Sequence, residues 1–225
     1  MIAMRTFSLG RVFRFMRGSP GLASGVTGLA YWEQRTRIYG ARAVLNLGHP
    51  EHEADAWTRR QTEEIFPHLG RCLTGDERVA LDFGCGPGRF TADLAAAIRG
   101  RAIGVDPIES LIHLAPRSPD VEYLVSDGRR IPLPDASVDL AWVCLVLGGL
   151  ADAHLAETAA ELDRVMRPGG LLFVVENTSE KKDFAHWAFR SVDSYRRVFP
   201  FTALSHLHDY DDLGERISIM AGRKA

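Results

Sequence analysis

A glycine-rich turn directly after a short apolar run is the first part of the chain whose residue types favour ligand binding. Residues 79–83 predict a buried strand, and Gly84-Cys85-Gly86-Pro87-Gly88 follows it. Glycines let the backbone turn sharply and approach a ligand closely, because they carry no Cβ. Backbone N–H groups at the start of a helix also attract carboxylates. The turn therefore predicts a site for the negatively charged end of a ligand.

Two aspartates stand at the ends of the next two predicted strands. Asp106 ends the strand 101–106, and Asp127 follows the strand 121–125. A carboxylate at the first position can accept both hydroxyls of a ribose, and one at the second can accept an adenine amino group. Ligands of doubly wound sheets bind beyond the carboxyl ends of the strands. Together with the turn, these aspartates predict a pocket for an adenosine-type compound.

Short apolar runs alternate with amphipathic stretches from about residue 78 onward, which predicts βα units and a parallel α/β sheet. Asp152 is expected to N-cap one of the helices. The remaining predicted elements are strands at 138–147, 171–176 and 217–221 and helices at 88–98, 108–115, 152–166 and 192–198.

Three stretches resemble motifs of the class I S-adenosylmethionine-dependent methyltransferases. Residues 81–88 resemble the first motif of that family, residues 131–139 its lead into the fourth strand, and residues 162–170 its approach to the fifth. The similarity covers about residues 76–224. It implies a Rossmann-like, doubly wound sheet of seven strands with the last strand antiparallel, and S-adenosyl-L-methionine as the cofactor.

The resemblance also assigns cofactor-binding positions, grouped by the part of the cofactor that each would meet. They are Asp82, Gly84, Cys85 and Gly86 at the methionine end, Asp106 at the ribose, Pro107, Ile108, Asp127 and Gly128 at the adenine, and Leu145 near the sulfonium.

A dinucleotide cofactor fits the same turn less well. The pattern G-x-G-x-x-G supplies room for a pyrophosphate, and Gly88 comes one residue too early for it. Pro87 also lacks the N–H group that a phosphate would bind. An oxidoreductase is therefore disfavoured.

The methyl acceptor is less well defined, because a general base is needed only for a poor nucleophile. Gly148 and Gly149, after the fourth predicted strand, offer no base but leave space for an acceptor. Glu176, at the end of the fifth strand, is the leading candidate for a catalytic, substrate-binding carboxylate; a capping or ion-paired role is equally open. The further candidates, each expected to be an ordinary surface or loop histidine, are His49, His186 and His208.

Residues 1–75 are expected to form an N-terminal extension and helical lid over the methyltransferase domain, residues 76–225. Tyr31, a second catalytic candidate, and Tyr39 are expected to bind substrate on the sulfonium side, where aromatic rings exclude water. A helical pair that packs on the sheet as core is an equal alternative. Deletion of residues 1–40 should abolish turnover if the lid exists.

Charge and composition limit the kinds of binding partner that we expect. The 225 residues include 27 Lys and Arg and 29 Asp and Glu, so the overall charge does not indicate binding to nucleic acid. The 3 cysteines lack metal-ligand spacing, so we expect no metal site and a reducing cytoplasm. The arginines of the N-terminus favour a membrane surface or a dimer partner, or else form part of a variable extension; they are Arg5, Arg11, Arg14 and Arg17.

We therefore expect N- or O-methylation of a small molecule, of a kind found in specialised metabolism. RNA or protein methylation and a non-catalytic, cofactor-binding scaffold are the alternatives. The sequence leaves the oligomeric state open between a monomer and a homodimer.

Overall fold

The structure is a computed structural model that describes residue 22 and residues 25–225. The basic N-terminal segment, with its predicted membrane contact, lies outside the described residues. Within the described part of the chain, no helix is both long and apolar enough to cross a membrane.

The centre of the molecule is a seven-stranded sheet in the order β3-β2-β1-β4-β5-β7-β6. Strands β1 to β5 are parallel, and β7 runs antiparallel to both β5 and β6. This confirms the predicted Rossmann-like sheet with an antiparallel last strand. The strands are β1 (Val79–Phe83), β2 (Arg101–Asp106), β3 (Val121–Val125), β4 (Val138–Cys144), β5 (Met166–Asn177), β6 (Ser205–Asp212) and β7 (Glu215–Arg223).

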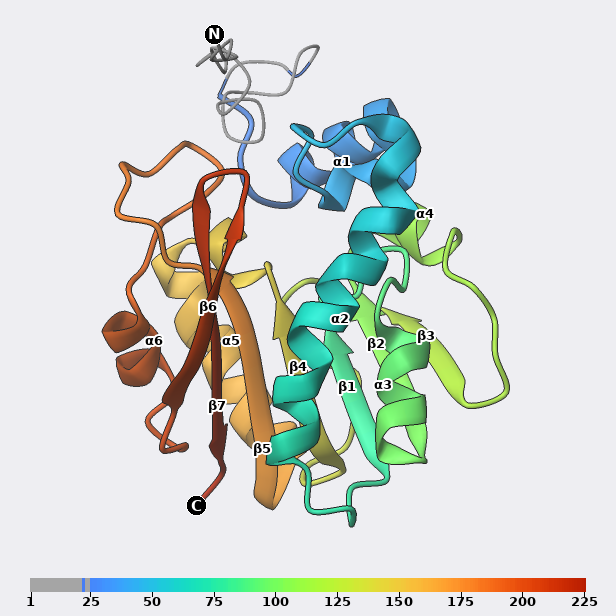
Figure 1. Ribbon diagram of the computed structural model, residues 1–225, viewed down its shortest axis with the longest axis vertical. Coiled ribbons are helices and arrows are strands. Elements are labelled where there is room, and N and C mark those ends of the chain that lie inside the picture. The colour runs from blue at the N-terminus through green and yellow to red at the C-terminus, as the bar shows by residue number, and fades with distance from the viewer. Residues whose placement is uncertain (1–21, 23–24) are drawn as a thin grey trace, which may run out of the picture.

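Helices cover both faces of this sheet (Figure 1). On one face, Ile65 of α2 and Leu94 of α3 pack around Trp142 of β4. On the other face, Leu162 of α5 and Tyr195 of α6 pack in a second cluster. The helices are α1 (Gly28–Tyr39), α2 (Ala54–Cys72), α3 (Thr91–Ile98), α4 (Glu109–Ile112), α5 (Asp152–Val165) and α6 (Val192–Val198), with 3₁₀ turns η1 (Gly40–Val44), η2 (Glu51–Glu53) and η3 (Leu147–Gly149).

The strand order reverses between β1 and β4, since β1 pairs with β2 on one side and with β4 on the other. Such a reversal opens a crevice at the carboxyl ends of the strands, where ligands bind. Helix α1 lies above this edge of the sheet (Figure 1). Residues 28–53, with α1, η1 and η2, are called the lid below. For helix α2 both lid and core were left open, and it contributes Ile65 and Leu69 to the core.

Several element boundaries differ from those predicted. Strand β4 ends at Cys144, because Leu145 adopts a positive φ of 57° that extended backbone does not tolerate. Asp152 is the first residue of α5 rather than its N-cap, which is Ala151; its carboxylate pairs instead with Arg190. Strand β5 begins at Met166, where the helix was predicted to continue.

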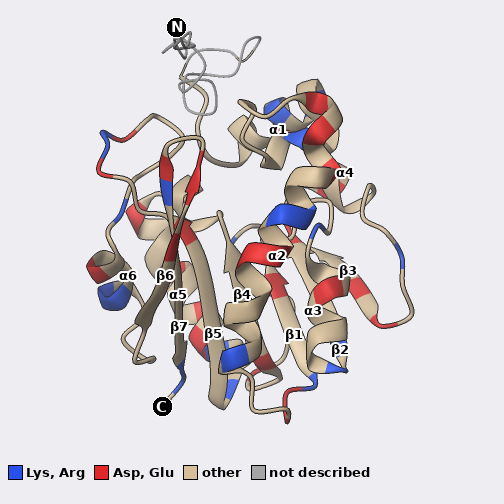
Figure 2. Ribbon diagram, viewed as in Figure 1, with Lys and Arg blue, Asp and Glu red and all other residues tan. Residues whose placement is uncertain are grey.

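Strand β6 was not predicted at all. It is an edge strand with the sequence Ser-His-Leu-His-Asp-Tyr-Asp-Asp, and most of its residues are exposed. Acidic side chains gather on the β6–β7 hairpin (Figure 2).

Candidate active site

The glycine turn after β1 is tied to β2 by its backbone. The N–H groups of Gly84 and Cys85 both donate to the carbonyl oxygen of Val105, at 2.8 and 3.2 Å. Gly84 and Gly86 have φ values of 72° and 54°, which L side chains adopt only at a cost in free energy. The turn is thus fixed at the carboxyl edge of the sheet, where it was predicted to lie. Burial raises the pKa of the Cys85 thiol, so this side chain adds no charge to the turn.

Asp106 links the turn to the end of β2. Its Oδ2 atom accepts a hydrogen bond from Gly86 N at 2.9 Å, and its Oδ1 atom accepts one from Ile108 N at 2.8 Å. The side chain is buried, and burial raises its pKa, whereas these two hydrogen bonds lower it. An ionised carboxylate has about four lone-pair sites, so each oxygen retains the capacity to accept a ribose hydroxyl.

Asp82 lies in β1 below the same turn and is almost fully buried. Burial and, to a smaller extent, the nearby charge of Asp106 raise its pKa to about 7, although a hydrogen bond from Thr91 Oγ1 at 2.6 Å acts in the opposite direction. A buried carboxylate of this kind is stabilised in its ionised form by an added cation. The methionine end of the cofactor carries an ammonium and a sulfonium, so the residues present fit that group.

Asp127 lies on the surface beyond β3, unlike the two buried aspartates. Its Oδ1 atom accepts hydrogen bonds from the backbone N–H groups of Arg129 and Arg130, at 2.9 and 2.8 Å, and these bonds lower its pKa. The carboxylate is therefore fixed in its ionised form at the end of the strand. Next to it, Gly128 adopts a φ of 77°.

The lid contacts the glycines of the predicted cofactor site. A Cβ built on Gly128 would lie 3.0 Å from Leu29, and one built on Gly86 would lie 3.0 Å from Val44. Leu29 belongs to α1 and Val44 to η1, so both halves of the lid lie against cofactor positions. The described part of the lid thus covers the predicted adenine and methionine ends.

Arg35 stabilises the lid through buried hydrogen bonds. Its guanidinium donates to the carbonyl oxygens of Ala43 and Leu45, at 2.6 and 3.0 Å, and to Tyr31 Oη at 2.9 Å. The side chain is only 1% exposed, and burial lowers its pKa. It also lies 5.9 Å from the ring centroid of Tyr39.

Tyr31 is buried in the lid, and its ring stacks on His186 at a centroid distance of 4.0 Å. Tyr31 and Tyr39 are therefore brought together by Arg35, and Tyr31 also joins the lid to the segment after β5. Their predicted roles at the methyl acceptor remain predictions.

A narrow cavity lies beneath the lid at the ends of β4, β5 and the β6–β7 hairpin. It is called the acceptor-side cavity below, because it lies on the opposite side of β1 from Asp106 and Asp127. Its walls are Val44, Leu45, Asn46, Trp57, Gln61, Arg89, Leu145, Asn177, Asp212, Glu215 and Ile217.

Arg89, which follows the glycine turn, supplies positive charge to this cavity. It donates to Thr58 Oγ1 at 3.0 Å and to Gln61 Oε1. Burial lowers its pKa, and the charge of Asp212 is among those that oppose the shift.

Asp212 supplies a negative charge to the cavity and is itself held by a histidine. Its Oδ1 atom lies 2.7 Å from Nε2 of His49, and both side chains are buried. The His49 ring stacks on Trp57 at a centroid distance of 3.9 Å. His49 was expected to be an ordinary surface or loop histidine; it does lie in a loop, but it is buried and pairs with a carboxylate of the cavity.

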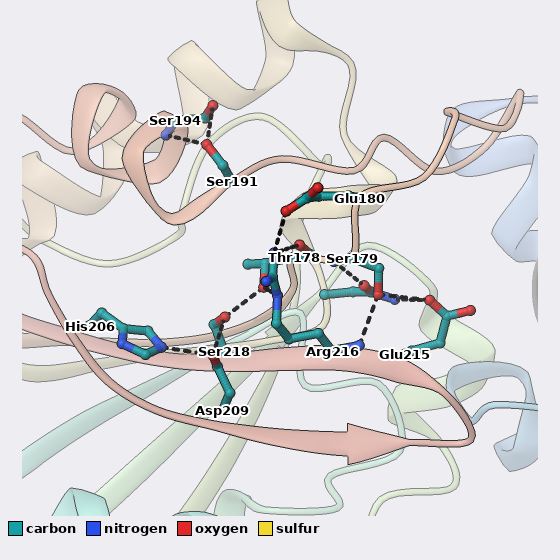
Figure 3. Close-up of polar contacts among 11 residues, drawn as sticks. Thr178, Ser179, Glu180, Ser191, Ser194, His206, Asp209, Glu215, Arg216 and Ser218 are labelled. Carbon is teal, nitrogen blue, oxygen red and sulfur yellow. Dashed lines mark hydrogen bonds and ion pairs between the residues drawn. The ribbon is translucent and has the colours of Figure 1, made fainter.

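A polar network fixes the segment after β5 against the β6–β7 hairpin (Figure 3). Thr178 and Ser218 share a hydrogen bond at 2.6 Å between their hydroxyls, and Ser218 donates to Asp209 at 2.6 Å. Ser179 donates to Glu215 at 2.9 Å. This network holds Glu215 at the cavity wall with its carboxylate already bonded.

Glu176 does not lie in the acceptor-side cavity. It is fully buried, and its Oε1 atom accepts hydrogen bonds from the backbone N–H groups of Val146 and Leu147, at 2.7 and 2.6 Å. Burial raises its pKa to about 7. The Oε1 atom thus stabilises the turn after β4, and the predicted catalytic role of Glu176 remains a prediction.

Gly148 does not leave space for an acceptor, contrary to expectation. A Cβ at Gly148 would lie 2.3 Å from the ring of Trp187, and one at Gly149 would lie 3.2 Å from Trp32. Two tryptophan rings thus cover this turn, and small residues are needed there so that the rings can pack.

Sequence reasoning missed Arg89, Gln61 and Asp212. Arg89 could have been identified from sequence, because it directly follows the glycine turn and must therefore lie close to the site. Asp212 carried no such signal, since it belongs to the unpredicted strand β6.

Comparison with known proteins agrees with this geometry. Residues 81–174 match the family described as "Methyltransferase domain". A malonyl-[acyl-carrier protein] O-methyltransferase of Yersinia pestis is 31% identical over 73% of this chain and 60% of its own. A probable S-adenosylmethionine-dependent methyltransferase of Mycolicibacterium smegmatis is 37% identical over 61% of this chain and 50% of its own. The chain thus spans only 50–60% of the length of these two relatives.

An N-terminal Xaa-Pro-Lys N-methyltransferase of Bos taurus is 30% identical over 68% of this chain and 73% of its own. Among solved structures, the DhpI–SAH complex has a TM-score of 0.64 at 17% identity, over 86% of this chain and 96% of the other. A methyltransferase of Aquifex aeolicus has a TM-score of 0.57 at 18% identity, over 75% of this chain and 97% of the other. With the strand order and the glycine turn, these matches show that the chain belongs to the class I S-adenosylmethionine-dependent methyltransferases.

Proposed function

We propose that this chain transfers the methyl group of S-adenosylmethionine to the nitrogen or oxygen of a small molecule that binds at the acceptor-side cavity, whose free volume of about 10 Å³ has to increase by movement of the lid. The observation that carries this proposal is the position of the cavity. It is walled by Leu145, the residue expected near the sulfonium, and it is roofed by Val44 and Leu45 of the lid. The cofactor, when bound, supplies a methyl group on a good leaving group, so the protein has to position the acceptor and exclude water.

The charges in the cavity indicate how an acceptor is held. Arg89 and Asp212 both line it, and no ion pair joins them among the described contacts. Arg89 would bind an anionic group of the acceptor, since a buried guanidinium favours carboxylate or phosphate partners. Asp212 would accept a hydrogen bond from the nucleophilic N–H or O–H group and take up its proton, with His49 fixing the carboxylate.

A macromolecular acceptor is the second candidate. The Yersinia relative is named for an acyl-carrier protein, and the bovine relative for a protein N-terminus. A narrow cavity beneath a lid favours a small acceptor or the tip of a carrier-bound one over a folded surface. A non-catalytic scaffold is the third candidate, and turnover alone separates it from the other two.

The test is turnover with methyl-labelled cofactor on a panel of small anionic amines, phenols and carboxylic acids, with an acyl-carrier protein and an N-terminal peptide as separate arms. We expect methylation of at least one small acceptor. Arg89→Gln should lower kcat/KM for it roughly 10-fold or more, as loss of a charged hydrogen bond predicts, and should preserve affinity for S-adenosylhomocysteine. Arg60→Gln, at an exposed position on α2, is the matched control. Methylation of the macromolecules alone would overturn the proposal.

A further inference from the structure

Three side chains with metal-binding atoms meet on the outer side of α2, apart from the residues that line the acceptor-side cavity. Glu64 and His68 stand one helical turn apart on α2, and His208 extends toward them from β6. His208 Nε2 lies 3.0 Å from Glu64 Oε1, and the two imidazole rings lie 4.7 Å apart with an interplanar angle of 19°. One ligand atom from each of the three lies within 4.8 Å of the others.

A histidine–carboxylate pair alone would account for His208 and Glu64. It does not account for His68, which brings a second imidazole to the same point. His68 Nδ1 accepts a hydrogen bond from a guanidinium nitrogen of Arg71 at 2.8 Å, and only a neutral ring can accept there. The neutral imidazole is the form that binds metals.

We propose that Glu64, His68 and His208 form a binding site for one Zn²⁺ ion. Two imidazole nitrogens and one carboxylate oxygen suit zinc, whereas Mg²⁺ and Ca²⁺ prefer oxygen ligands alone. Tetrahedral zinc with bonds of about 2.0–2.2 Å places its ligand atoms about 3.3 Å apart. The three side chains are exposed or partly exposed, so their rotamers are free to adjust toward that spacing. Solvent supplies the fourth ligand.

Arg71 competes with the ion for the same imidazole. One of its guanidinium nitrogens lies 2.8 Å from His68 Nδ1, where it donates a hydrogen bond to the neutral ring. Arg71 is exposed and can turn away when the ion binds. Removal of this arginine should therefore strengthen zinc binding, which would show that His68 is a ligand.

An ion at this site would join α2 to the edge strand β6. Both elements carry walls of the acceptor-side cavity, namely Gln61 on α2 and Asp212 on β6. Gln61 and His68 are seven residues apart, or roughly 10 Å along a helix, so the ion would stabilise the frame of the cavity without contacting the acceptor.

The experiment uses the full chain after dialysis against a chelator, titrated with ZnCl₂ by calorimetry. Visible absorption with CoCl₂ provides a second readout of the ligand geometry. We expect one Zn²⁺ ion per chain and a rise in melting temperature as it binds. His68→Ala and His208→Ala should each weaken binding by at least the 10- to 100-fold that loss of an outer partner costs, and Arg71→Ala should tighten it.

His206→Ala is the matched control, because His206 lies on the same strand and pairs with Asp209 at 2.7 Å without a third ligand. It should bind zinc as the unmodified chain does, and circular dichroism should show that every variant is folded. No saturable binding to the unmodified chain, or equal binding to the chain with both His68 and His208 replaced, would overturn the proposal. A preference for MgCl₂ would overturn it as well.

Discussion

Asp106 has two tasks that use the same carboxylate. It fixes the backbone of the glycine turn through Gly86 and Ile108, and we propose that it also binds the ribose of the cofactor. An amide at this position keeps a single acceptor oxygen, so it can serve neither task in full. The geometry therefore makes Asp106 the side chain on which cofactor affinity depends most directly.

We predict that Asp106→Asn lowers the affinity for S-adenosylhomocysteine roughly 10- to 100-fold, because hydrogen bonds to charged groups contribute about 1.5–3 kcal/mol. Isothermal titration calorimetry measures this directly. Glu109→Gln, at an exposed position three residues along, is the control and should bind normally. Unchanged affinity in Asp106→Asn would remove this residue from the cofactor site.

Glu176 links protein stability to pH. Burial raises its pKa from 4.5 to about 7, so between these values the folded state binds a proton that the unfolded state releases. This contribution to the free energy of unfolding is present below pH 4.5 and is lost as the pH rises through about 7. The shift corresponds to on the order of 3 kcal/mol.

Glu176→Gln keeps an oxygen that can accept the N–H groups of Val146 and Leu147, but it does not titrate. We predict that the free energy of unfolding of this variant, relative to the unmodified protein, rises between pH 5 and pH 8. Urea denaturation at the two values measures the change. The opposing titration of His186, whose pKa burial lowers to about 4, cancels in this comparison. A difference that does not vary with pH would contradict the assignment.

The site could be predicted from sequence where one short segment contains both the strand and its functional end. The glycine turn, Asp106 and Asp127 were located in this way. The acceptor side could not be, because His49, Arg89 and Asp212 are far apart in the chain and meet only in the tertiary structure. Glu176 shows the opposite limit, since its position at a strand end did not indicate that its Oε1 atom accepts two backbone hydrogen bonds inside the fold.

At the scale of elements, prediction succeeded for the first three strands, including the partly exposed edge strand β3. Strands β1, β2 and β3 begin and end at the predicted residues, because glycines or aspartates bound each run. Strand β6 was missed because it forms through pairing with β7 and not through any apolar pattern of its own. The lid was predicted from its aromatic residues, yet its central contacts depend on Arg35.

We predict that Arg35→Met loosens the lid and leaves the sheet intact. Two backbone carbonyls and the Tyr31 hydroxyl would lose their donor, at a cost of about 1–3 kcal/mol. Amide hydrogen exchange in residues 28–53 should accelerate roughly 5- to 100-fold, while exchange in β1 and β4 stays unchanged. Arg37→Met, at an exposed position on α1, provides the control. Equal acceleration in the sheet would show that Arg35 supports the whole fold.

For the whole molecule, the lid and the sheet differ in what they contribute. The two hydrophobic clusters draw only on residues from α2 onward among those described, and the lid adds none to them. The lid instead supplies Val44, Leu45 and Asn46 to the acceptor-side cavity and places Leu29 against Gly128. Folding and ligand binding are therefore separable along the chain.

We predict that a chain beginning at Ala54 keeps the sheet and loses the site. Its circular dichroism and cooperative thermal unfolding should persist, because both hydrophobic clusters stay complete. Its affinity for S-adenosylhomocysteine should fall at least 10-fold and its turnover should vanish, since water enters the site and His49 no longer holds Asp212. Calorimetry and a methyl-transfer assay on the same preparation measure both effects. A truncated chain that retains turnover would show that the cofactor and acceptor are held by the sheet alone, and one that fails to fold would show that the lid belongs to the core.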